Sequence, residues 1–376
     1  MAYFDCAATA PMSDEVIEAW TFAVKQRGNA SAVHRDGQHS RLLWEEGREA
    51  VAKSIGATPF DVTMTGSGTE AINLAIKGLY WGRNKDASRP RILTTRAEHH
   101  AALDAVQWLA DSEGATVEFV AVDPNGAVDI DDLRAKLGSD VAVFTTLWVN
   151  NEVGTINDVD AIVAAAREHD VPVHMDAVAA WGHVPIDFAA SGLAALSVSA
   201  HKIGGPVSVG ALAVARGWNI VPSIHGGSQQ RLRSGSLDVA GVYAAGAAAR
   251  LATADMDRST AHMLYMTARL REGLVAEVPQ AILRGHPTRR SPSNLHITVP
   301  GLDSVSALFL LDEAGHAVSA GSACQAGVTA PSHVLHAMGV DDTEGPLRFT
   351  VGPRTTAADV DALLEVLPGI IARTTR

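Results

Sequence analysis

The sequence predicts an α/β protein in which a large domain with a mainly parallel sheet is joined to a smaller α+β domain. With 376 residues, the chain is too long for one ordinary compact core. Between about residues 60 and 215, short apolar runs alternate with amphipathic segments, and an Ala-rich helical pattern, Leu237–Glu272, follows. We expect the large domain to span residues 15–250 and the small domain to combine residues 1–14 with 251–376.

The strands expected in the large domain are rich in Val, Ile, Leu and Thr. They are Asp61–Thr65, Arg91–Thr95, Thr116–Val122, Val141–Leu147, Val171–Met175, Leu193–Ser199 and Gly210–Val214. The helical patterns between most of them are Thr69–Leu79, His99–Asp111, Ile130–Leu137 and Val159–Glu168. Such alternation predicts parallel strands covered by helices on both faces, with ligands bound at the carboxyl ends of the strands.

The C-terminal part, from about residue 278, mixes strands and helices without regular alternation. Its expected strands are Asn294–Thr298, His316–Ser319 and Leu347–Val351, and its expected helices are Ser304–Asp312, Ser332–Met338 and Ala357–Arg373. The segment Arg284–Pro292 carries basic residues and two prolines, which predicts a loop.

Composition and charge exclude several classes of protein. Hydrophobic residues make up 47% and charged residues 19% of the chain, which is typical of a globular enzyme. The net charge of -12 argues against sequence-independent binding of nucleic acid. No apolar run approaches the roughly 18 residues that span a bilayer, so we expect no membrane segment. The N-terminus has no basic segment before an apolar one, so we expect no signal peptide.

The cysteines and histidines point to neither a disulfide nor a metal site. The two cysteines, Cys6 and Cys324, are far apart in sequence, which makes a disulfide framework improbable and a reducing cytoplasm the expected location. No Cys/His cluster has metal-ligand spacing, and the neighbours His99 and His100 rarely point at one ion. We therefore expect no metal.

A Gly-rich turn, Thr65-Gly66-Ser67-Gly68-Thr69-Glu70, lies between an expected strand and an expected helix. Free backbone N–H groups and the positive end of the helix dipole make such a turn an anion site, suited to a phosphate. An ordinary capped turn is the alternative, and the spacing alone favours it. The turn is neither a dinucleotide fingerprint nor a P-loop.

An apolar strand ends in a carboxylate at Val173-His174-Met175-Asp176. A buried Asp needs a cationic partner or several donors, and a protonated pyridine nitrogen would serve. The alternative is that Asp176 caps the following helix. Taken alone, the cap is the better interpretation.

A lysine follows the next apolar strand, in Ser199-Ala200-His201-Lys202, before a Gly-Gly-Pro turn. Desolvation there would lower its pKa and make the amine nucleophilic, as a Schiff-base lysine requires. The alternative is a surface lysine in a loop, and most lysines are of that kind.

A single cysteine lies among small residues in the segment 319–327, with Gly321 before Cys324 and Gly327 after it. An exposed thiolate there could attack a sulfur atom. A small buried cysteine is an equally good interpretation. The phosphate turn, the buried acid and the lysine together match the needs of pyridoxal phosphate, and their combination is stronger than any one of them.

The sequence resembles the cysteine desulfurases, which belong to the class V aminotransferase group with the fold type I pyridoxal-phosphate architecture. The resemblance runs from Tyr3-Phe4-Asp5 to the last helix. Its further anchors are Gly28-Asn29-Ala30-Ser31, Thr65 to Glu70, Glu98-His99-His100, Val149-Asn150-Asn151-Glu152-Val153-Gly154, Ser199 to Lys202, His225-Gly226-Gly227, Arg233-Ser234-Gly235 and Gly321-Ser322-Ala323-Cys324.

The resemblance implies a role for each matching residue. Lys202 would hold the cofactor covalently, and His99 would stack on its ring and take part in proton transfer. Asp176 would pair with the ring nitrogen, while Asn151 and Arg348 would hold the substrate carboxylate. The phosphate contacts would come from Gly68, Thr69, Ser199 and His201, and from Ser236 of the partner subunit's chain.

The resemblance also implies the reaction and its partners. L-cysteine would lose its sulfur to the Cys324 thiolate, leaving a persulfide on the enzyme and releasing alanine. The spacing from Cys324 to Pro331-Ser332-His333 resembles the branch with a long mobile cysteine loop that carries sulfur. A homodimer and a sulfur-acceptor protein are implied. Iron–sulfur scaffolds, tRNA thiolation, cofactor synthesis and DNA phosphorothioation are possible destinations of the sulfur. We expect neither direct nucleic-acid binding nor a membrane partner.

The sequence departs from the family at one cofactor contact. The family usually has Gln three residues after the ring-nitrogen Asp, and this chain has Ala179. One hydrogen bond to the cofactor's phenolic oxygen is then missing, a loss on the order of 1 kcal/mol. Two alternatives stay open on the sequence: a selenocysteine lyase or another class V lyase or aminotransferase, and a scaffold with weakened catalysis in a sulfur-transfer complex.

Overall fold

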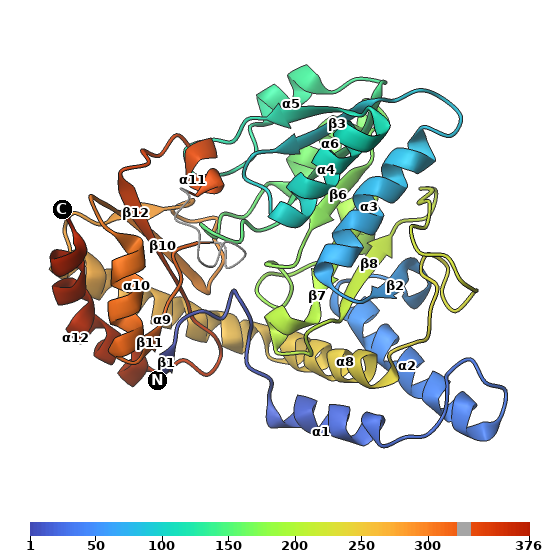
Figure 1. Ribbon diagram of the computed structural model, residues 1–376, viewed down its shortest axis with the longest axis horizontal. Coiled ribbons are helices and arrows are strands. Elements are labelled where there is room, and N and C mark those ends of the chain that lie inside the picture. Colours follow the sequence, from blue (N-terminus) through green and yellow to red (C-terminus); the bar gives the residue numbers. More distant parts are fainter. Residues whose placement is uncertain (322–331) are drawn as a thin grey trace.

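The computed structural model describes residues 1–321 and 332–376, and its centre is a seven-stranded sheet in the order β2-β8-β7-β6-β5-β3-β4 (Figure 1). Strand β8 runs antiparallel to both of its neighbours, and the other neighbouring pairs are parallel. The mainly parallel sheet predicted from the sequence is confirmed. Its strands are β2 (Val62–Thr65), β3 (Arg91–Thr95), β4 (Thr116–Val120), β5 (Val141–Leu147), β6 (Val173–Asp176), β7 (Ala195–Ser199) and β8 (Gly210–Val214).

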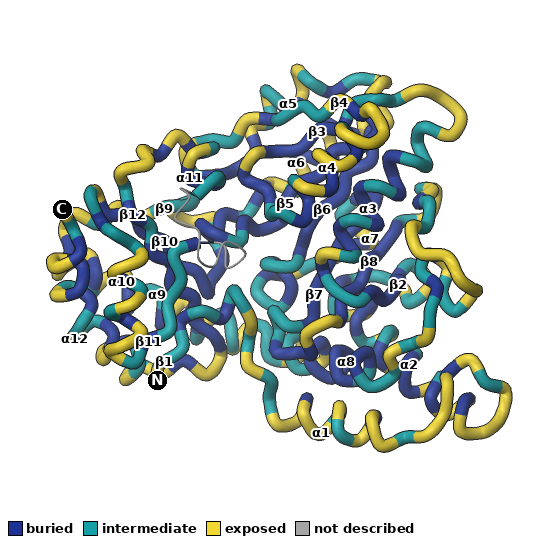
Figure 2. The backbone as a smooth tube through the Cα atoms, in the orientation of Figure 1, coloured by how far each residue is buried: buried dark blue, intermediate teal, exposed yellow. Residues whose placement is uncertain are grey.

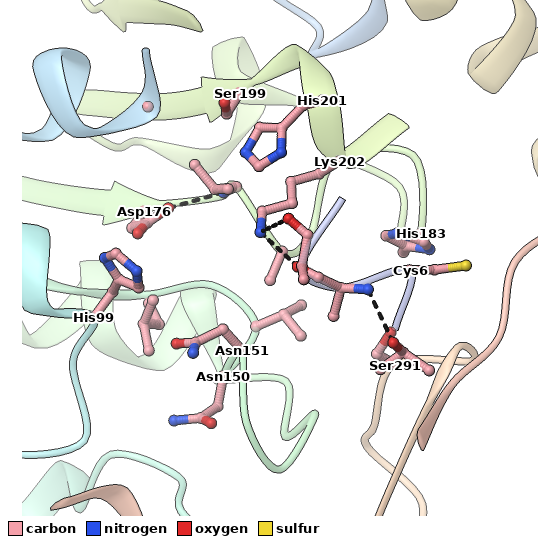
Figure 3. Close-up of a pocket in the computed structure, with 18 of the residues that line it drawn as sticks. Cys6, His99, Asn150, Asn151, Asp176, His183, Ser199, His201, Lys202 and Ser291 are labelled. Carbon is pink, nitrogen blue, oxygen red and sulfur yellow. Dashed lines mark hydrogen bonds between the residues drawn. The ribbon is translucent and has the colours of Figure 1, made fainter. Parts of the chain in front are cut away.

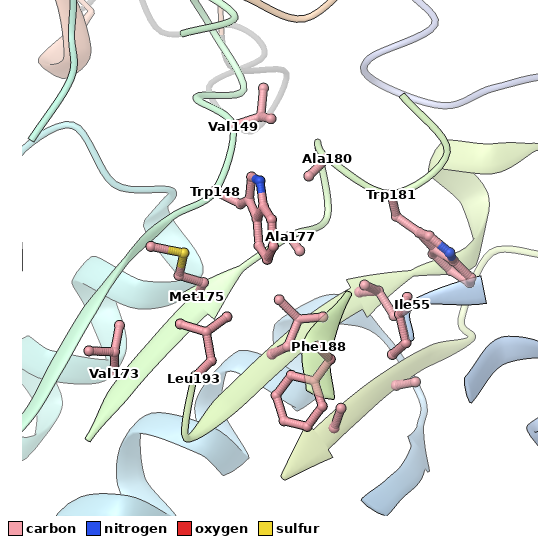
Figure 4. Packing of buried hydrophobic residues seen from close by; sticks show 14 of the residues in the cluster. Ile55, Trp148, Val149, Val173, Met175, Ala177, Ala180, Trp181, Phe188 and Leu193 are labelled. Atoms are coloured by element: carbon pink, nitrogen blue, oxygen red, sulfur yellow. The ribbon is translucent and has the colours of Figure 1, made fainter. Parts of the chain in front are cut away.

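Helices cover both faces of this sheet, so its central strands are buried on both sides. One hydrophobic cluster joins the sheet to α2, α5, α6 and α8, and another joins it to α3 and α4. Figure 4 shows part of the first cluster, and Figure 2 shows the central strands as buried. The helices are α1 (Asp14–Val24), α2 (Arg35–Ser54), α3 (Gly68–Arg83), α4 (His100–Glu113), α5 (Ile130–Lys136), α6 (Val159–Arg167), α7 (Phe188–Ser191) and α8 (Val239–Ala254).

A second, three-stranded antiparallel sheet in the order β12-β10-β9 forms the C-terminal part. Its hydrophobic cluster also contains Phe4, because the N-terminal strand β1 pairs in parallel with β11 (Figure 1). The elements are β1 (Ala2–Tyr3), α9 (Met256–Glu277), β9 (Ile282–Arg284), β10 (Asn294–Pro300), α10 (Ser304–Glu313), β11 (His316–Ala317), α11 (His333–Ala337), β12 (Glu344–Thr350) and α12 (Ala357–Thr374).

Helices α1, α2 and α7 and strands β1 and β9 were not predicted. Helices α1 and α2 lie in the first 60 residues, and α2 is mostly polar on the outside. What holds α2 in place is close packing on α8: a Cβ on Gly47 would lie 2.3 Å from the carbonyl oxygen of Val242. The short strand β9 takes up Arg284, the first residue of the predicted loop. None of the described helices is long and apolar enough to span a bilayer.

Candidate active site

A cavity of about 320 Å³ lies at the carboxyl ends of the parallel strands, where the second sheet and the N-terminal segment meet the first sheet. Figure 3 shows Lys202 at its centre, with Asp176 and His99 to one side and Cys6 and His183 to the other. The predicted site residues that line it are Gly68, Thr69, His99, Asn151, Asp176, Ser199, His201, Lys202 and Arg348.

The Gly-rich turn forms one end of the cavity. Ser67 caps α3 by accepting the backbone N–H of Glu70 at 3.0 Å, and Gly68 opens the helix. A Cβ on Gly68 would lie 3.0 Å from both Ser199 Cβ and Val178 Cγ2, so the backbone lies close to the end of β7 and to the segment after β6. A helix N-terminus bordered by hydroxyl groups is suited to a phosphate.

Asp176 ends β6 and is 3% exposed. Its Oδ1 accepts the N–H of Val178 at 2.8 Å. Burial raises its pKa to about 6, while the Val178 N–H and the Lys202 cation act in the other direction. A carboxyl group buried in this way gains most from a cation placed against it in the cavity.

Lys202 lies in the turn η2 (Ala200–Ile203) that follows β7. Its Nζ donates to the carbonyl oxygens of Ala7 and Ala8, the latter at 3.0 Å. The N-terminal segment therefore contacts the predicted cofactor lysine directly. This contact joins residues nearly 200 positions apart, and no sequence pattern indicated it.

His99 caps α4, and its Nδ1 accepts the N–H of Ala101 at 3.1 Å. Burial, with Lys202 nearby, lowers its pKa to about 4, so the ring is neutral at pH 7. A neutral, half-buried imidazole at the cavity wall is suited to stack on an aromatic ring. His201 is held in the same neutral form, because burial and Lys202 lower its pKa to about 4.

Arg348 reaches the cavity from β12 of the second sheet and is 2% exposed. Its guanidinium donates to the backbone oxygen of Asn151 and to Asp5 Oδ1, both at 2.9 Å. The backbone of Arg348 exchanges hydrogen bonds with the backbone of Ser319, which holds this part of β12 in place. Asp5 belongs to the first motif of the family resemblance, but no sequence pattern indicated its contact with Arg348.

Three further residues of the cavity had no predicted role in it. Burial raises the pKa of the Cys6 thiol to about 12, and a Cβ on Gly352 would lie 2.9 Å from Sγ, so this cysteine is closely packed. His183 lines the same wall, and burial lowers its pKa to about 4. Ala179 also lines the cavity, where the family's Gln would stand.

Two predicted residues are not placed in the cavity. Ser236 is exposed and is not among the lining residues. Cys324 lies outside the described residues. Within the described residues, no group of three or more His, Cys, Asp or Glu side chains is arranged to hold a metal ion.

The fold and the cavity are those expected of a class V aminotransferase. The chain matches the Aminotransferase class-V family over residues 2–363. It is 46% identical over 383 residues to the "IscS-like cysteine desulfurase" of Mycobacterium tuberculosis (strain ATCC 25618 / H37Rv), covering 100% of this chain and 98% of that protein. It is 38% identical to the "Cysteine desulfurase IscS" of Methanosarcina thermophila, covering 99% of this chain and 92% of that protein. A solved structure described as a NifS-like protein matches with a TM-score of 0.92 and 31% identity, covering 99% of this chain and 100% of that one. This chain belongs to the cysteine desulfurase family.

Enzymes of this family use pyridoxal phosphate, and the cavity fits that group. The helix N-terminus at Gly68 suits the phosphate, and the buried carboxyl group of Asp176 needs a cation such as a protonated ring nitrogen. Lys202 supplies an amine between these two features, and His99 supplies a neutral ring.

Proposed function

We propose that this chain is a pyridoxal-phosphate-dependent cysteine desulfurase, which takes sulfur from L-cysteine and leaves L-alanine and a persulfide on Cys324. The observation that carries the proposal is the cavity, which gathers Lys202, Asp176 and Arg348 from three separate parts of the chain. An amine, a partner for a ring nitrogen and a carboxylate clamp are what a reaction at the α-carbon of an amino acid requires.

The residues divide the work of binding. When bound, the cofactor supplies an electron sink for negative charge at the α-carbon. Asp176 would keep the ring nitrogen protonated, and His99 would lie against the ring. Arg348 and Asn151 hold the substrate carboxylate, and Asp5 keeps the guanidinium oriented at 2.9 Å.

The Lys202 amine would carry protons to and from the substrate when it is not bound to the cofactor. The carbonyl oxygens of Ala7 and Ala8 accept hydrogen bonds from Nζ, so they hold the ammonium form close to the substrate. His201 stays neutral beside it, which avoids a second positive charge in the cavity.

Cys324 takes the sulfur. Its thiolate attacks the substrate sulfur, so an S–S bond forms while the C–S bond breaks. The electron pair of the broken bond stays on the carbon, which takes a proton and becomes the methyl group of alanine. A sulfur-acceptor protein, or a thiol reductant, then removes the persulfide sulfur.

We also propose a homodimer, in which Ser236 completes the phosphate site of the partner subunit. Ser236 is exposed, and large apolar side chains are exposed on the same domain at Val33, Phe60, Val207 and Ile224. Sedimentation of the holoenzyme should give a dimer, and Ser236→Ala should weaken cofactor binding without changing the dimer.

The domain division and the location belong to the same proposal. We place the large domain at residues 15–250 and the small domain at residues 1–14 and 251–376, carrying Cys324. The separate hydrophobic cluster around β10 and β12, which includes Phe4, supports this division. A reducing compartment such as the cytoplasm suits the thiol chemistry.

The test is reconstitution with pyridoxal phosphate, followed by assays of sulfide and alanine released from L-cysteine with a thiol reductant. We expect a yellow protein whose colour is lost in Lys202→Ala and whose sulfide release is lost in Cys324→Ala. A Cys324→Ala protein that releases sulfide as fast as the wild type would contradict the role of Cys324. A protein that stays colourless would overturn the proposal.

A further inference from the structure

Glu98 is a fully buried carboxyl group behind the predicted cofactor site. It lies in the turn between β3 and α4, directly before His99, and its exposed fraction is 0%. The donors that face it are the Thr146 hydroxyl and the backbone N–H groups of Leu147 and His99. Within the described residues, neither carboxylate oxygen makes a hydrogen bond of regular geometry.

The charge with the largest effect on Glu98 belongs to another acid, Asp176. Leu147 of β5 is the cross-strand partner of Asp176 of β6, so the carboxyl group that faces Leu147 also lies beside Asp176. The two groups interact electrostatically, and the Asp176 charge adds to the effect of burial on Glu98. Two carboxylates in a buried site cannot both ionise cheaply, so one of them keeps its proton.

The surroundings decide which acid keeps the proton. Lys202 lies close enough to Asp176 to favour its ionised form, whereas at Glu98 burial and the Asp176 charge outweigh the three donors that face the carboxyl group. These effects raise the pKa of Glu98 to about 8, above that of Asp176 at about 6. The other titratable groups near this turn are His99, His100 and His333, whose ring contacts the backbone oxygen of Glu98 at 2.8 Å.

We propose that Glu98 is a positioning residue that stays a neutral carboxylic acid, so that Asp176 is the single carboxylate at the ring-nitrogen end of the cofactor site. The proposal rests on the proposed function, because it requires that the cofactor binds in this cavity. Glu98 itself is not among the residues that line the cavity. Glu98 acts on the ring through Asp176 and through the backbone of His99. Its ionisation would add a second negative charge to this end of the site.

The first measurement uses the apoenzyme, which does not depend on activity. The unfolded chain ionises Glu98 above its ordinary pKa of 4.5, while the folded chain keeps the proton up to about pH 8. The stability that Glu98 contributes is therefore present below pH 4.5 and is lost as the pH rises toward 8. Gln has no such proton, so the melting temperature of Glu98→Gln relative to wild type should rise by several degrees between pH 5 and pH 8.

Glu98→Leu is the matched control, because it also removes titration but cannot face the N–H groups of Leu147 and His99. It should show the same trend with pH, at lower melting temperatures throughout. A Glu98→Gln difference that is constant with pH, or that shrinks as the pH rises, would overturn the proposal, because either result means that Glu98 is already ionised.

The second measurement titrates the visible absorption band of the holoenzyme. A neutral Glu98 adds no charge beside Asp176 below about pH 8, so Glu98→Gln should leave the absorption band unchanged at pH values up to about 7. A band that differs between wild type and Glu98→Gln in this range would overturn the proposal, because it means that Glu98 is ionised there. If wild type binds the cofactor but releases no sulfide, the proposed function fails while both measurements still decide the role of Glu98.

Discussion

The two sheets reach the same cavity but contribute to it in different ways. The seven-stranded sheet presents residues at its strand ends, where Asp176 and Lys202 each follow an apolar run. The three-stranded sheet presents Arg348 from within β12, and residues from two other parts of the chain hold it in place. The first wall of the cavity, which the seven-stranded sheet forms, follows from local sequence. The second wall, which the three-stranded sheet forms, depends on contacts made only in the folded chain.

The largest effect should come from the first wall. Lys202→Ala removes the amine that would bind the cofactor and return protons, and no other lysine lines the cavity within the described residues. We expect sulfide release to fall by roughly 1,000-fold or more, with loss of the yellow band. The matched control is Lys77→Ala, on α3 outside the cavity, which should keep both. A Lys202→Ala enzyme that stayed yellow and active would show that this wall does not hold the cofactor.

The second wall should fail more gradually. Asp5→Asn keeps the shape of the Arg348 contact but removes its charge, so we expect roughly a tenfold rise in KM for L-cysteine with little change in the absorption band. Asp361→Asn is the control, because Asp361 accepts two hydrogen bonds from Arg269 on the surface, away from the cavity. Equal KM values in the two variants would mean that Asp5 does not orient the substrate clamp.

The same contrast explains what the sequence could predict. The strands Arg91–Thr95, Val141–Leu147 and Gly210–Val214 have the predicted bounds, because each is an apolar or β-branched run of strand length. The contact of Asp5 with Arg348 spans 343 positions, and no local pattern can indicate such a pairing. Helix α2 was missed for a related reason, since its position depends on Gly47 meeting α8.

Acid should weaken both sheets through one buried histidine in each. Burial lowers the pKa of His174 in β6 and of His296 in β10 from 6.5 to about 3. The unfolded chain takes up these protons below pH 6.5 and the folded chain does not, so stability is present above pH 6.5 and is lost as the pH falls toward 3. From pH 7 to pH 5, each histidine should cost about 2 kcal/mol of unfolding free energy. Urea unfolding of the apoenzyme at several pH values measures the loss, and a flat profile would contradict it.

The smallest expected effect on stability comes from comparing substitutions of these two histidines. The His174 ring bonds to Thr145 Oγ1 at 2.8 Å and to Ser197 Oγ at 2.9 Å. Neither ring nitrogen of His296 has a hydrogen-bond partner within the described residues, and Arg348 and Arg284 are its cross-strand neighbours. His174→Leu leaves two hydroxyl groups unpaired, so it should cost roughly 2–3 kcal/mol at pH 7.

His296→Leu replaces an unpartnered buried ring by an apolar side chain of similar size, so it should change the unfolding free energy by less than about 1 kcal/mol at pH 7. At pH 5 this variant should be more stable than the wild type, because it no longer carries a buried ring that must stay neutral near three arginines. A large loss at pH 7 would mean that the ring of His296 does have a partner in solution, and that the small sheet, like the large one, stabilises a polar group at its centre.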